Sequence, residues 1–136
     1  MDPMPHTPPR IVLVVDDDSA IGDNLNEIFE LEGYVCWLAR SAEAGLRRLE
    51  LESRSPDVIL LDLEMPGMPA QRFISRLKDR ATWSGVPIIL MTGASHGDIP
   101  PDLQVDVLLP KPFSLALLLE LVGGRAHRTT SDSSRA

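Results

Sequence analysis

Short runs of apolar residues recur along the chain, and most of them end on a polar or charged residue. The runs are rich in Val, Ile and Leu and barely alternate with polar residues, which is typical of strands buried on both faces of a parallel sheet. They are residues 11–15 before Asp16-Asp17-Asp18, 34–39, 58–61 before Asp62, 88–91 before Thr92, and 105–109 before Pro110-Lys111-Pro112. The pattern predicts a sheet of parallel strands.

The segments between these runs carry apolar residues at helical spacing and are bounded by residues that start or stop helices. Ser19, Ser41 and Ser114 stand where helix caps are expected, since a serine hydroxyl accepts a hydrogen bond from the first turn. Gly33 and Gly123-Gly124 are expected to end the first and last helices. A further helix is marked by Ala70, Phe73, Ile74 and Leu77. Alternating strands and helices predict an α/β fold with right-handed crossovers.

The polar residues that follow the apolar runs are expected to meet. In an open parallel sheet the ligand crevice lies beyond the carboxyl ends of the strands. The aspartates at 16–18, Asp62, Thr92 and Lys111 would then gather at one edge of the sheet. Several carboxylates, a hydroxyl and an ammonium group suit a divalent cation together with a phosphoryl group.

Composition and charge restrict the function classes. The length of 136 residues and the 43% hydrophobic content suit one compact domain. A net charge of −7 argues against nucleic acid as a direct partner, because binding phosphates needs clustered Lys and Arg. The single cysteine, Cys36, excludes an internal disulfide and suits a reducing compartment. Because no apolar run reaches membrane-spanning length, we expect a cytoplasmic protein without membrane insertion.

The two ends of the chain differ from its middle. Residues 1–9 carry four prolines, and residues 123–136 are polar and of low complexity. Such segments cannot bury enough apolar surface to fold. We therefore predict a disordered leader over 1–9, a folded domain over 10–122, and a disordered polar tail over 123–136.

Taken together and in their order, the motifs resemble the receiver domain of bacterial two-component response regulators over about residues 10–122. Each motif alone would be a weak match. They are VLVVDDD for the acidic pocket, LLDLEMPGM for the phosphoacceptor strand and loop, PIILMTGAS for the threonine strand, and LLPKPF for the lysine strand. The resemblance implies a flavodoxin-like (βα)5 sandwich of three layers, whose parallel five-stranded sheet has the order 2-1-3-4-5.

The resemblance also implies a phosphoacceptor and a magnesium site. Asp62 would be the phosphoacceptor, because a carboxylate can attack phosphorus and form an acyl phosphate. The ligands of Mg²⁺ would be Asp17, Asp62 and the backbone carbonyl of Glu64, with Asp16 acting through water. Because clustered carboxylates repel one another, at least one of them should have a raised pKa.

Two further groups would hold the phosphoryl oxygens. The resemblance assigns this role to the Lys111 ammonium group and to the Thr92 hydroxyl, and it implies a cis Lys111–Pro112 peptide. The protein would then be a signalling module and not an enzyme, apart from catalysing its own phosphorylation and dephosphorylation. It would take a phosphoryl group from a histidine kinase or histidine phosphotransferase and change its affinity for a downstream protein target.

Three features depart from the family pattern. Leu108 stands three residues before Lys111, where the family has a Tyr or Phe that swings inward on phosphorylation. The stretch between Thr92 and Lys111 is short and includes Gly97, Pro100 and Pro101, so the fourth helix is expected to be shortened or replaced by a loop. Glu64 is acidic, which would change how water reaches an acyl phosphate.

The last helix carries more apolar residues than one buried face needs. Its core positions are expected to be Leu115, Leu118, Leu119 and Val122. Leu117 and Leu121, four residues apart, would form a second stripe that serves a partner or a homodimer. The mobile element of the output would be the loop over residues 93–104.

An alternative from another class is a haloacid-dehalogenase-like phosphatase, with Asp16 as nucleophile and Asp18 as general acid. It is disfavoured because it leaves Asp62 without a role, and because no acidic pair follows Lys111. The sequence also leaves open whether the domain stands alone or was cut from a hybrid histidine kinase.

Overall fold

The computed structural model describes residues 10–93, 99–100 and 102–126. The predicted leader and the part of the predicted tail beyond residue 126 lie outside this range. The strands are β1 (Ile11–Val15), β2 (Val35–Ala39), β3 (Val58–Asp62), β4 (Ile88–Thr92) and β5 (Val107–Pro110). The helices are α1 (Ser19–Leu31), α2 (Ala42–Leu51), α3 (Ala70–Lys78), α4 (Ala81–Ser84) and α5 (Leu115–Ala126).

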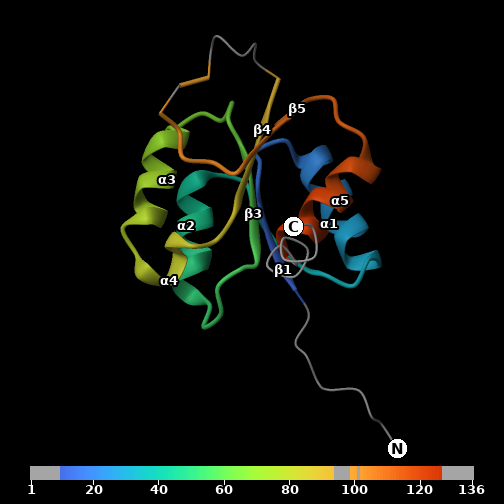
Figure 1. Ribbon diagram of the computed structural model, residues 1–136, viewed down its shortest axis with the longest axis horizontal. Helices are drawn as coiled ribbons and strands as arrows, with labels where there is room; N and C mark the ends of the chain where they lie inside the picture. Colours follow the sequence, from blue (N-terminus) through green and yellow to red (C-terminus); the bar gives the residue numbers. More distant parts are fainter. Residues whose placement is uncertain (1–9, 94–98, 101, 127–136) are drawn as a thin grey trace, which may run out of the picture.

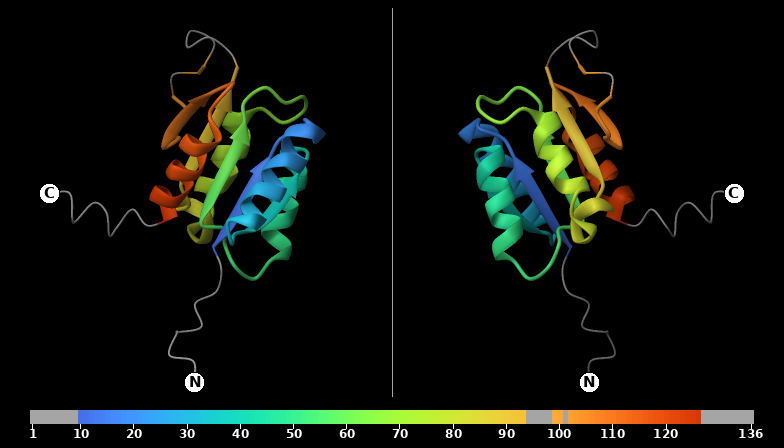
Figure 2. Two further views of the ribbon diagram at one scale, coloured as in Figure 1. Left: turned by 90° about the vertical axis from the view of Figure 1, so that its right-hand side faces the viewer. Right: turned by 90° about the vertical axis from the view of Figure 1, so that its left-hand side faces the viewer.

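The strands form one parallel five-stranded sheet of order β2-β1-β3-β4-β5. Helices α1 and α5 cover one face of the sheet, and α2, α3 and the short α4 lie on the other (Figure 1). The side views show the same three layers (Figure 2). The predicted flavodoxin-like architecture and strand order are confirmed.

The core lies on both faces of the sheet. Every residue of β1, β3 and β4 is buried, which explains why these strands read as unbroken apolar runs. One cluster of buried side chains packs β1, β3 and β4 against α2 and α3, and a second packs the opposite faces of these strands against α1 and α5. The edge strands β2 and β5 are more exposed, and Leu109 is the buried residue of β5.

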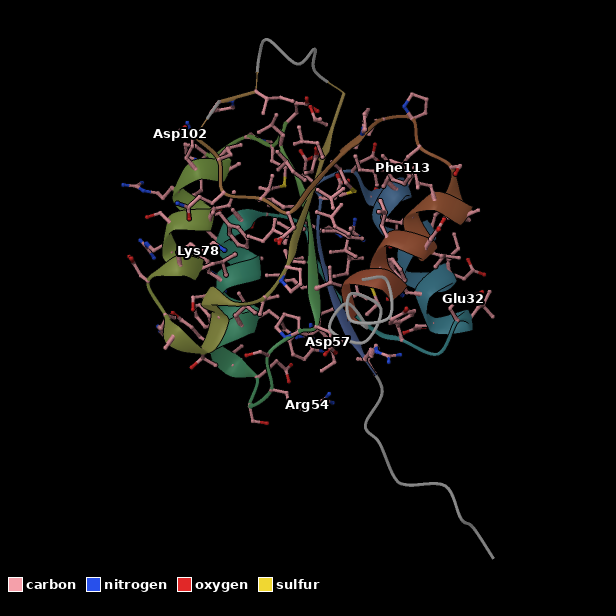
Figure 3. All side chains as sticks on the ribbon, viewed as in Figure 1. Glu32, Arg54, Asp57, Lys78, Asp102 and Phe113 are labelled. Atoms are coloured by element: carbon pink, nitrogen blue, oxygen red, sulfur yellow. The ribbon has the colours of Figure 1, made fainter. Side chains whose placement is uncertain are left out.

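Two aspartates fix strand register at the end of the sheet where β3 and β5 begin. Asp57 directly precedes β3 and accepts a hydrogen bond from the Ile11 amide at 2.7 Å, while Asp106 precedes β5 and accepts one from the Ile88 amide at 2.8 Å. The amides of Asp57 and Asp106 donate in return to the carbonyls of Ile11 and Ile88. Figure 3 shows Asp57 at this end of the sheet.

Helix caps follow the sequence predictions with one correction. The Ser41 hydroxyl accepts from the Ala44 amide and the Ser114 hydroxyl from the Leu117 amide, both at 3.0 Å, as predicted. Gly33, beyond the end of α1, has φ +90°. The cap of α1 is Asp18 and not Ser19, which is the first helical residue. Both are capping residue types, so the sequence alone did not separate these neighbours.

The predicted end of the last helix was wrong. Helix α5 continues through Gly123-Gly124 to Ala126. Each glycine costs a helix about 1 kcal/mol relative to alanine, but glycine keeps the backbone N–H that proline lacks, so it need not stop a helix. On the same helix Leu118 and Val122 are fully buried, whereas Leu115, expected in the core, is 41% exposed.

No helix appears in the described part of the connection between β4 and β5, namely residue 93, residues 99–100 and residues 102–106. The short α4 precedes β4 and does not belong to this connection. Ile99, Leu103 and Val105 pack against the first core cluster instead, so irregular chain covers this part of the sheet. Leu108 is 37% exposed. Residues 94–98 and 101 lie outside the described range.

Candidate functional site

Three carboxylates meet at the carboxyl ends of β1 and β3. Asp16 and Asp17 directly follow β1, and Asp62 is the last residue of β3. One ligand atom from each of the three lies within 4.8 Å of the others. Asp16 and Asp62 are almost entirely buried, and Asp17 is exposed. The predicted convergence of charge at this edge is confirmed.

Backbone hydrogen bonds fix these strand ends. The Asp16 amide donates to the Ala39 carbonyl at 3.0 Å, which extends the pairing of β1 with β2 by one residue. The Asp16 side chain in turn accepts from the Asp18 amide at 2.9 Å. Similarly, the Lys111 amide donates to the Thr92 carbonyl at 2.7 Å. The sheet thus fixes the backbone at Asp16 and at Lys111.

Lys111 supplies the positive charge of the site. Its Nζ lies 3.3 Å from Asp62 Oδ1 and 3.6 Å from Asp16 Oδ2. The Lys111–Pro112 peptide is cis, as the resemblance implied. Burial disfavours the charged ammonium group, but the charges of Asp62 and Asp16 outweigh this effect and raise the pKa of Lys111. The lysine is therefore a fixed positive charge at neutral pH.

Asp62 is the carboxylate whose ionisation the site makes costly. Burial, followed by the negative charge of Asp16, raises the pKa of Asp62 from its ordinary value of 3.8 to about 6. Lys111 and the hydrogen bond from the Glu64 amide, at 3.2 Å, oppose this rise without cancelling it. The expectation of a raised pKa in the acidic cluster is confirmed for Asp62.

The donor set suits a divalent cation. Asp16 Oδ2 is buried and has no hydrogen-bond partner within the described part of the chain. One nearby ammonium group does not balance three carboxylates, and an added cation would supply the missing charge. Mg²⁺ prefers oxygen ligands and needs only one or two carboxylates from the protein. The triad can therefore hold a metal ion.

The end of β4 is organised differently. Thr92, 2% exposed, donates its hydroxyl hydrogen bond to Glu64 Oε2 at 2.9 Å. The Gly93 amide lies 3.1 Å and 3.2 Å from the two carboxylate oxygens of Glu64. Glu64 was expected to offer its carbonyl oxygen to Mg²⁺ and to change how water reaches an acyl phosphate, so the hydrogen bonds of its side chain to Thr92 and Gly93 were missed. The only signal in the sequence was its acidity two residues after Asp62.

Asp18 does not take the part that the phosphatase alternative requires. Its carboxylate accepts hydrogen bonds from the Ala20 and Ile21 amides, at 3.0 and 3.1 Å, and caps α1. A carboxylate held in this way stabilises the helix start. The acidic triad consists of Asp16, Asp17 and Asp62 without it.

A groove of about 560 Å³ borders the site on the side of α1 and α5. It lies between α1 and the segment over residues 111–115, and most of its lining is apolar. Phe113 is on this side of the sheet, whereas Lys78 and Asp102 are on the other (Figure 3). Lys111 belongs both to the groove and to the charged cluster.

The family model described as the response regulator receiver domain matches residues 12–123. The chain belongs to this family. Receiver domains typically act as phosphoacceptors without being enzymes, they bind Mg²⁺, and they imply a cognate histidine kinase. The buried carboxylates and the nearby lysine of this receiver are consistent with an aspartate phosphoacceptor.

Relatives and solved structures agree with this assignment. The response regulator MprA of Mycolicibacterium vanbaalenii is 33% identical over 127 residues, covering 91% of this chain and 53% of the relative. KdpE of Escherichia coli, a KDP operon transcriptional regulatory protein, is 34% identical over 110 residues, covering 79% of this chain and 47% of the relative. The chain thus spans about half the length of these curated relatives.

Among solved structures, a CheY-like receiver domain from Methanospirillum hungatei superposes with a TM-score of 0.79 at 26% identity, covering 91% of this chain and 98% of that one. The receiver domain of a signal transduction histidine kinase from Syntrophus aciditrophicus gives 0.75 at 26% identity, covering 86% and 89%. No helix in the described residues is long and apolar enough to cross a membrane.

Proposed function

We propose that this receiver is a phosphoacceptor module of a two-component phosphorelay and that Asp62 accepts the phosphoryl group. The observation that best supports this proposal is that Asp62, a buried member of the carboxylate triad, lies 3.3 Å from the Lys111 ammonium group. An Asp62 oxygen attacks the phosphorus of a phosphohistidine, the phosphorus–nitrogen bond breaks, and the imidazole leaves as the acyl phosphate forms. The receiver contributes position and charge, which dominate phosphoryl transfer.

The other charged residues divide the remaining work. We assign Mg²⁺ binding to Asp17, Asp62 and the Glu64 carbonyl, with Asp16 acting through water. When bound, Mg²⁺ neutralises negative charge on the transferring group. Lys111 pairs with one phosphoryl oxygen, and the Thr92 hydroxyl donates to another.

The proposed donor is a histidine kinase or histidine phosphotransferase in the cytoplasm, and the groove beside α1 is its docking place. A macromolecular donor needs a contact surface next to the acceptor, and this mostly apolar groove shares Lys111 with the site. Ile28→Arg should slow transfer from a phosphorylated kinase that serves the unaltered protein. Uptake from acetyl phosphate, which needs no docking surface, should not change. Equal transfer from the kinase in both proteins would rule out this docking place.

The output is proposed to be altered binding of a protein target, and not direct contact with nucleic acid. KdpE is named as a transcriptional regulatory protein, and the Syntrophus domain is named as a receiver domain of a histidine kinase. Similar receivers therefore occur both in transcriptional regulators and in histidine kinases. A homodimer through Leu117 and Leu121 stays a prediction. Leu117 is 43% exposed, but Leu121 is partly buried against the second core cluster, so the two do not form the fully exposed stripe that was expected.

The direct test uses a small phosphodonor. The protein is incubated with Mg²⁺ and acetyl phosphate, and its intact mass is measured. One phosphoryl group should add to the unaltered protein, none should add without Mg²⁺, and none should add to Asp62→Asn.

The matched control is Asp18→Asn, the same chemical change two residues from Asp16. Asparagine also caps helices well, so this variant should fold and take up the phosphoryl group normally. Uptake that survives in Asp62→Asn but disappears in Asp16→Asn would overturn the proposal and favour the phosphatase alternative.

A further inference from the structure

The Glu64 side chain occupies the donors that the proposed phosphoryl site needs. It reaches from the loop after β3 to the end of β4, where it accepts from the Thr92 hydroxyl at 2.9 Å and from the Gly93 amide at 3.1 Å. Thr92 is the last residue of β4, the strand next to the one that ends at Asp62, and Gly93 directly follows it. A loop carboxylate therefore already satisfies the threonine side of the site.

A carboxylate and a phosphoryl group make similar demands on hydrogen-bond donors. Both spread negative charge over several oxygen atoms, and both form stronger hydrogen bonds than neutral acceptors do. One hydroxyl and one backbone amide cannot serve two anions at full strength. The two anions would also repel each other at the short distance that shared donors impose.

We propose that Glu64 is an internal competitor of the phosphoryl group, which holds the Thr92 and Gly93 donors until a group bound at Asp62 displaces it. The inference rests on the proposed role of Asp62 as acceptor. In the unphosphorylated protein, Glu64 gives the buried Thr92 hydroxyl a hydrogen-bond acceptor.

The structure allows this displacement without disturbing the core. Glu64 is exposed, so its carboxylate can turn into solvent. Its amide donates to Asp62 Oδ1 at 3.2 Å, and this bond can persist while the side chain leaves. The displaced element is thus one side chain and not the loop backbone.

The test compares variants in their affinity for beryllofluoride, a stable phosphoryl analogue, titrated at saturating Mg²⁺. Glu64→Gln removes the charge, and Glu64→Ala removes the acceptor altogether. Both should bind beryllofluoride about tenfold more tightly than the unaltered protein, the equivalent of one hydrogen bond to a charged group. Both substitutions are at an exposed position and should leave the fold intact.

Glu43→Gln is the matched control. Glu43 is an exposed acid of α2 that lies beside the same loop, near Gly67. Because Glu43 does not accept the hydrogen bonds from Thr92 and Gly93 that Glu64 accepts, the affinity of the Glu43→Gln variant for beryllofluoride should stay within about twofold of that of the unaltered protein. This is the effect expected of a screened surface charge. In Glu64→Ala the amide resonance of Gly93 should also shift before any ligand is added, since its acceptor is gone.

The outcomes distinguish a failure of the competitor role of Glu64 from a failure of the proposed function. Equal affinity in the unaltered protein and both Glu64 variants would overturn the competitor role. An equal gain in Glu43→Gln would do the same, because it would show a general effect of charge. If no variant binds beryllofluoride and none gains mass from acetyl phosphate, the proposed function fails and this inference fails with it.

Discussion

The carboxylate side and the threonine side of the site differ in how their polar groups are satisfied. On the carboxylate side, Asp16 and Asp62 are buried against Lys111, and Asp16 Oδ2 has no hydrogen-bond partner within the described residues. On the threonine side, the donors of Thr92 and Gly93 are both taken up by Glu64. The carboxylate side has unbalanced negative charge, whereas the donors of the threonine side are already bound to the Glu64 carboxylate.

This difference indicates which side a ligand stabilises and which side a ligand must rearrange. A cation at the carboxylate side relieves repulsion that the fold has imposed. A phosphoryl group at the threonine side has to replace an existing partner. Ligand binding should thus be strongly sensitive to changes on the first side and only moderately sensitive to changes on the second.

The largest expected effect is on metal binding. Asp17→Asn should weaken Mg²⁺ affinity by roughly ten- to a hundredfold, because it removes a negative charge beside a divalent cation. Isothermal titration calorimetry measures the Mg²⁺ affinity of the variant and of the unaltered protein. Asp23→Asn is the control, since Asp23 is an exposed acid of α1 paired with Arg40. Unchanged affinity in Asp17→Asn would mean that the cluster is only a solvated strand end.

The second effect is on the stability of the metal-free protein. The pKa of Asp62 is about 6 in the folded state and 3.8 without the site, so folding favours the protonated form. This stability is complete below about pH 4 and is lost as pH rises through 6. Asp62→Asn should therefore raise the free energy of unfolding by about 2 kcal/mol at pH 7 in EDTA, and by much less at pH 4.

Urea denaturation at the two pH values tests this prediction. A gain that is the same at pH 4 and pH 7 would trace the effect to packing and not to charge.

The third effect separates the two sides. Thr92→Val keeps the shape of the residue but removes its hydroxyl, and with it the hydrogen bond to Glu64. The free energy of unfolding should fall by about 1 kcal/mol, the usual worth of such a bond. Mg²⁺ affinity should not change. A large loss of Mg²⁺ affinity would show that the two sides are coupled in the unphosphorylated protein.

The smallest effect concerns Leu108, which replaces the Tyr or Phe of the family pattern and is 37% exposed. Leu108→Ala should leave phosphoryl uptake from acetyl phosphate unchanged, because this side chain belongs to neither side of the site. Intact-mass time courses measure uptake. A marked slowing would mean that the Leu108 side chain helps to set the position of Thr92.

The centre of the fold could be predicted because its strands are apolar on both faces. In β1, β3 and β4 the polar residues stand only at the ends, so strand position and site position follow from one pattern. The start of β5 was harder to predict. The apolar run begins at residue 105, but Asp106 pairs with Ile88 and the strand starts at Val107. An aspartate directly before an apolar run, at 57 and at 106, was the available signal.

The charged members of the site were predictable for the same reason, and the Glu64 side chain was not. Asp16, Asp62 and Lys111 are placed by strand ends, which the sequence locates. The direction of Glu64 depends on the path of the loop after β3 and on the Thr92 and Gly93 donors at the end of β4, which only the assembled sheet brings within reach.

The central claim is that the phosphoryl group is carried by Asp62. Reduction with borohydride converts an aspartyl phosphate into homoserine, so the residue that carried the phosphoryl group is marked permanently. The protein is treated with Mg²⁺ and acetyl phosphate, reduced, digested and mapped by peptide mass spectrometry. We predict homoserine at position 62 and at no other aspartate. Homoserine at position 16, or at none of the aspartates after a confirmed gain in mass, would contradict the claim.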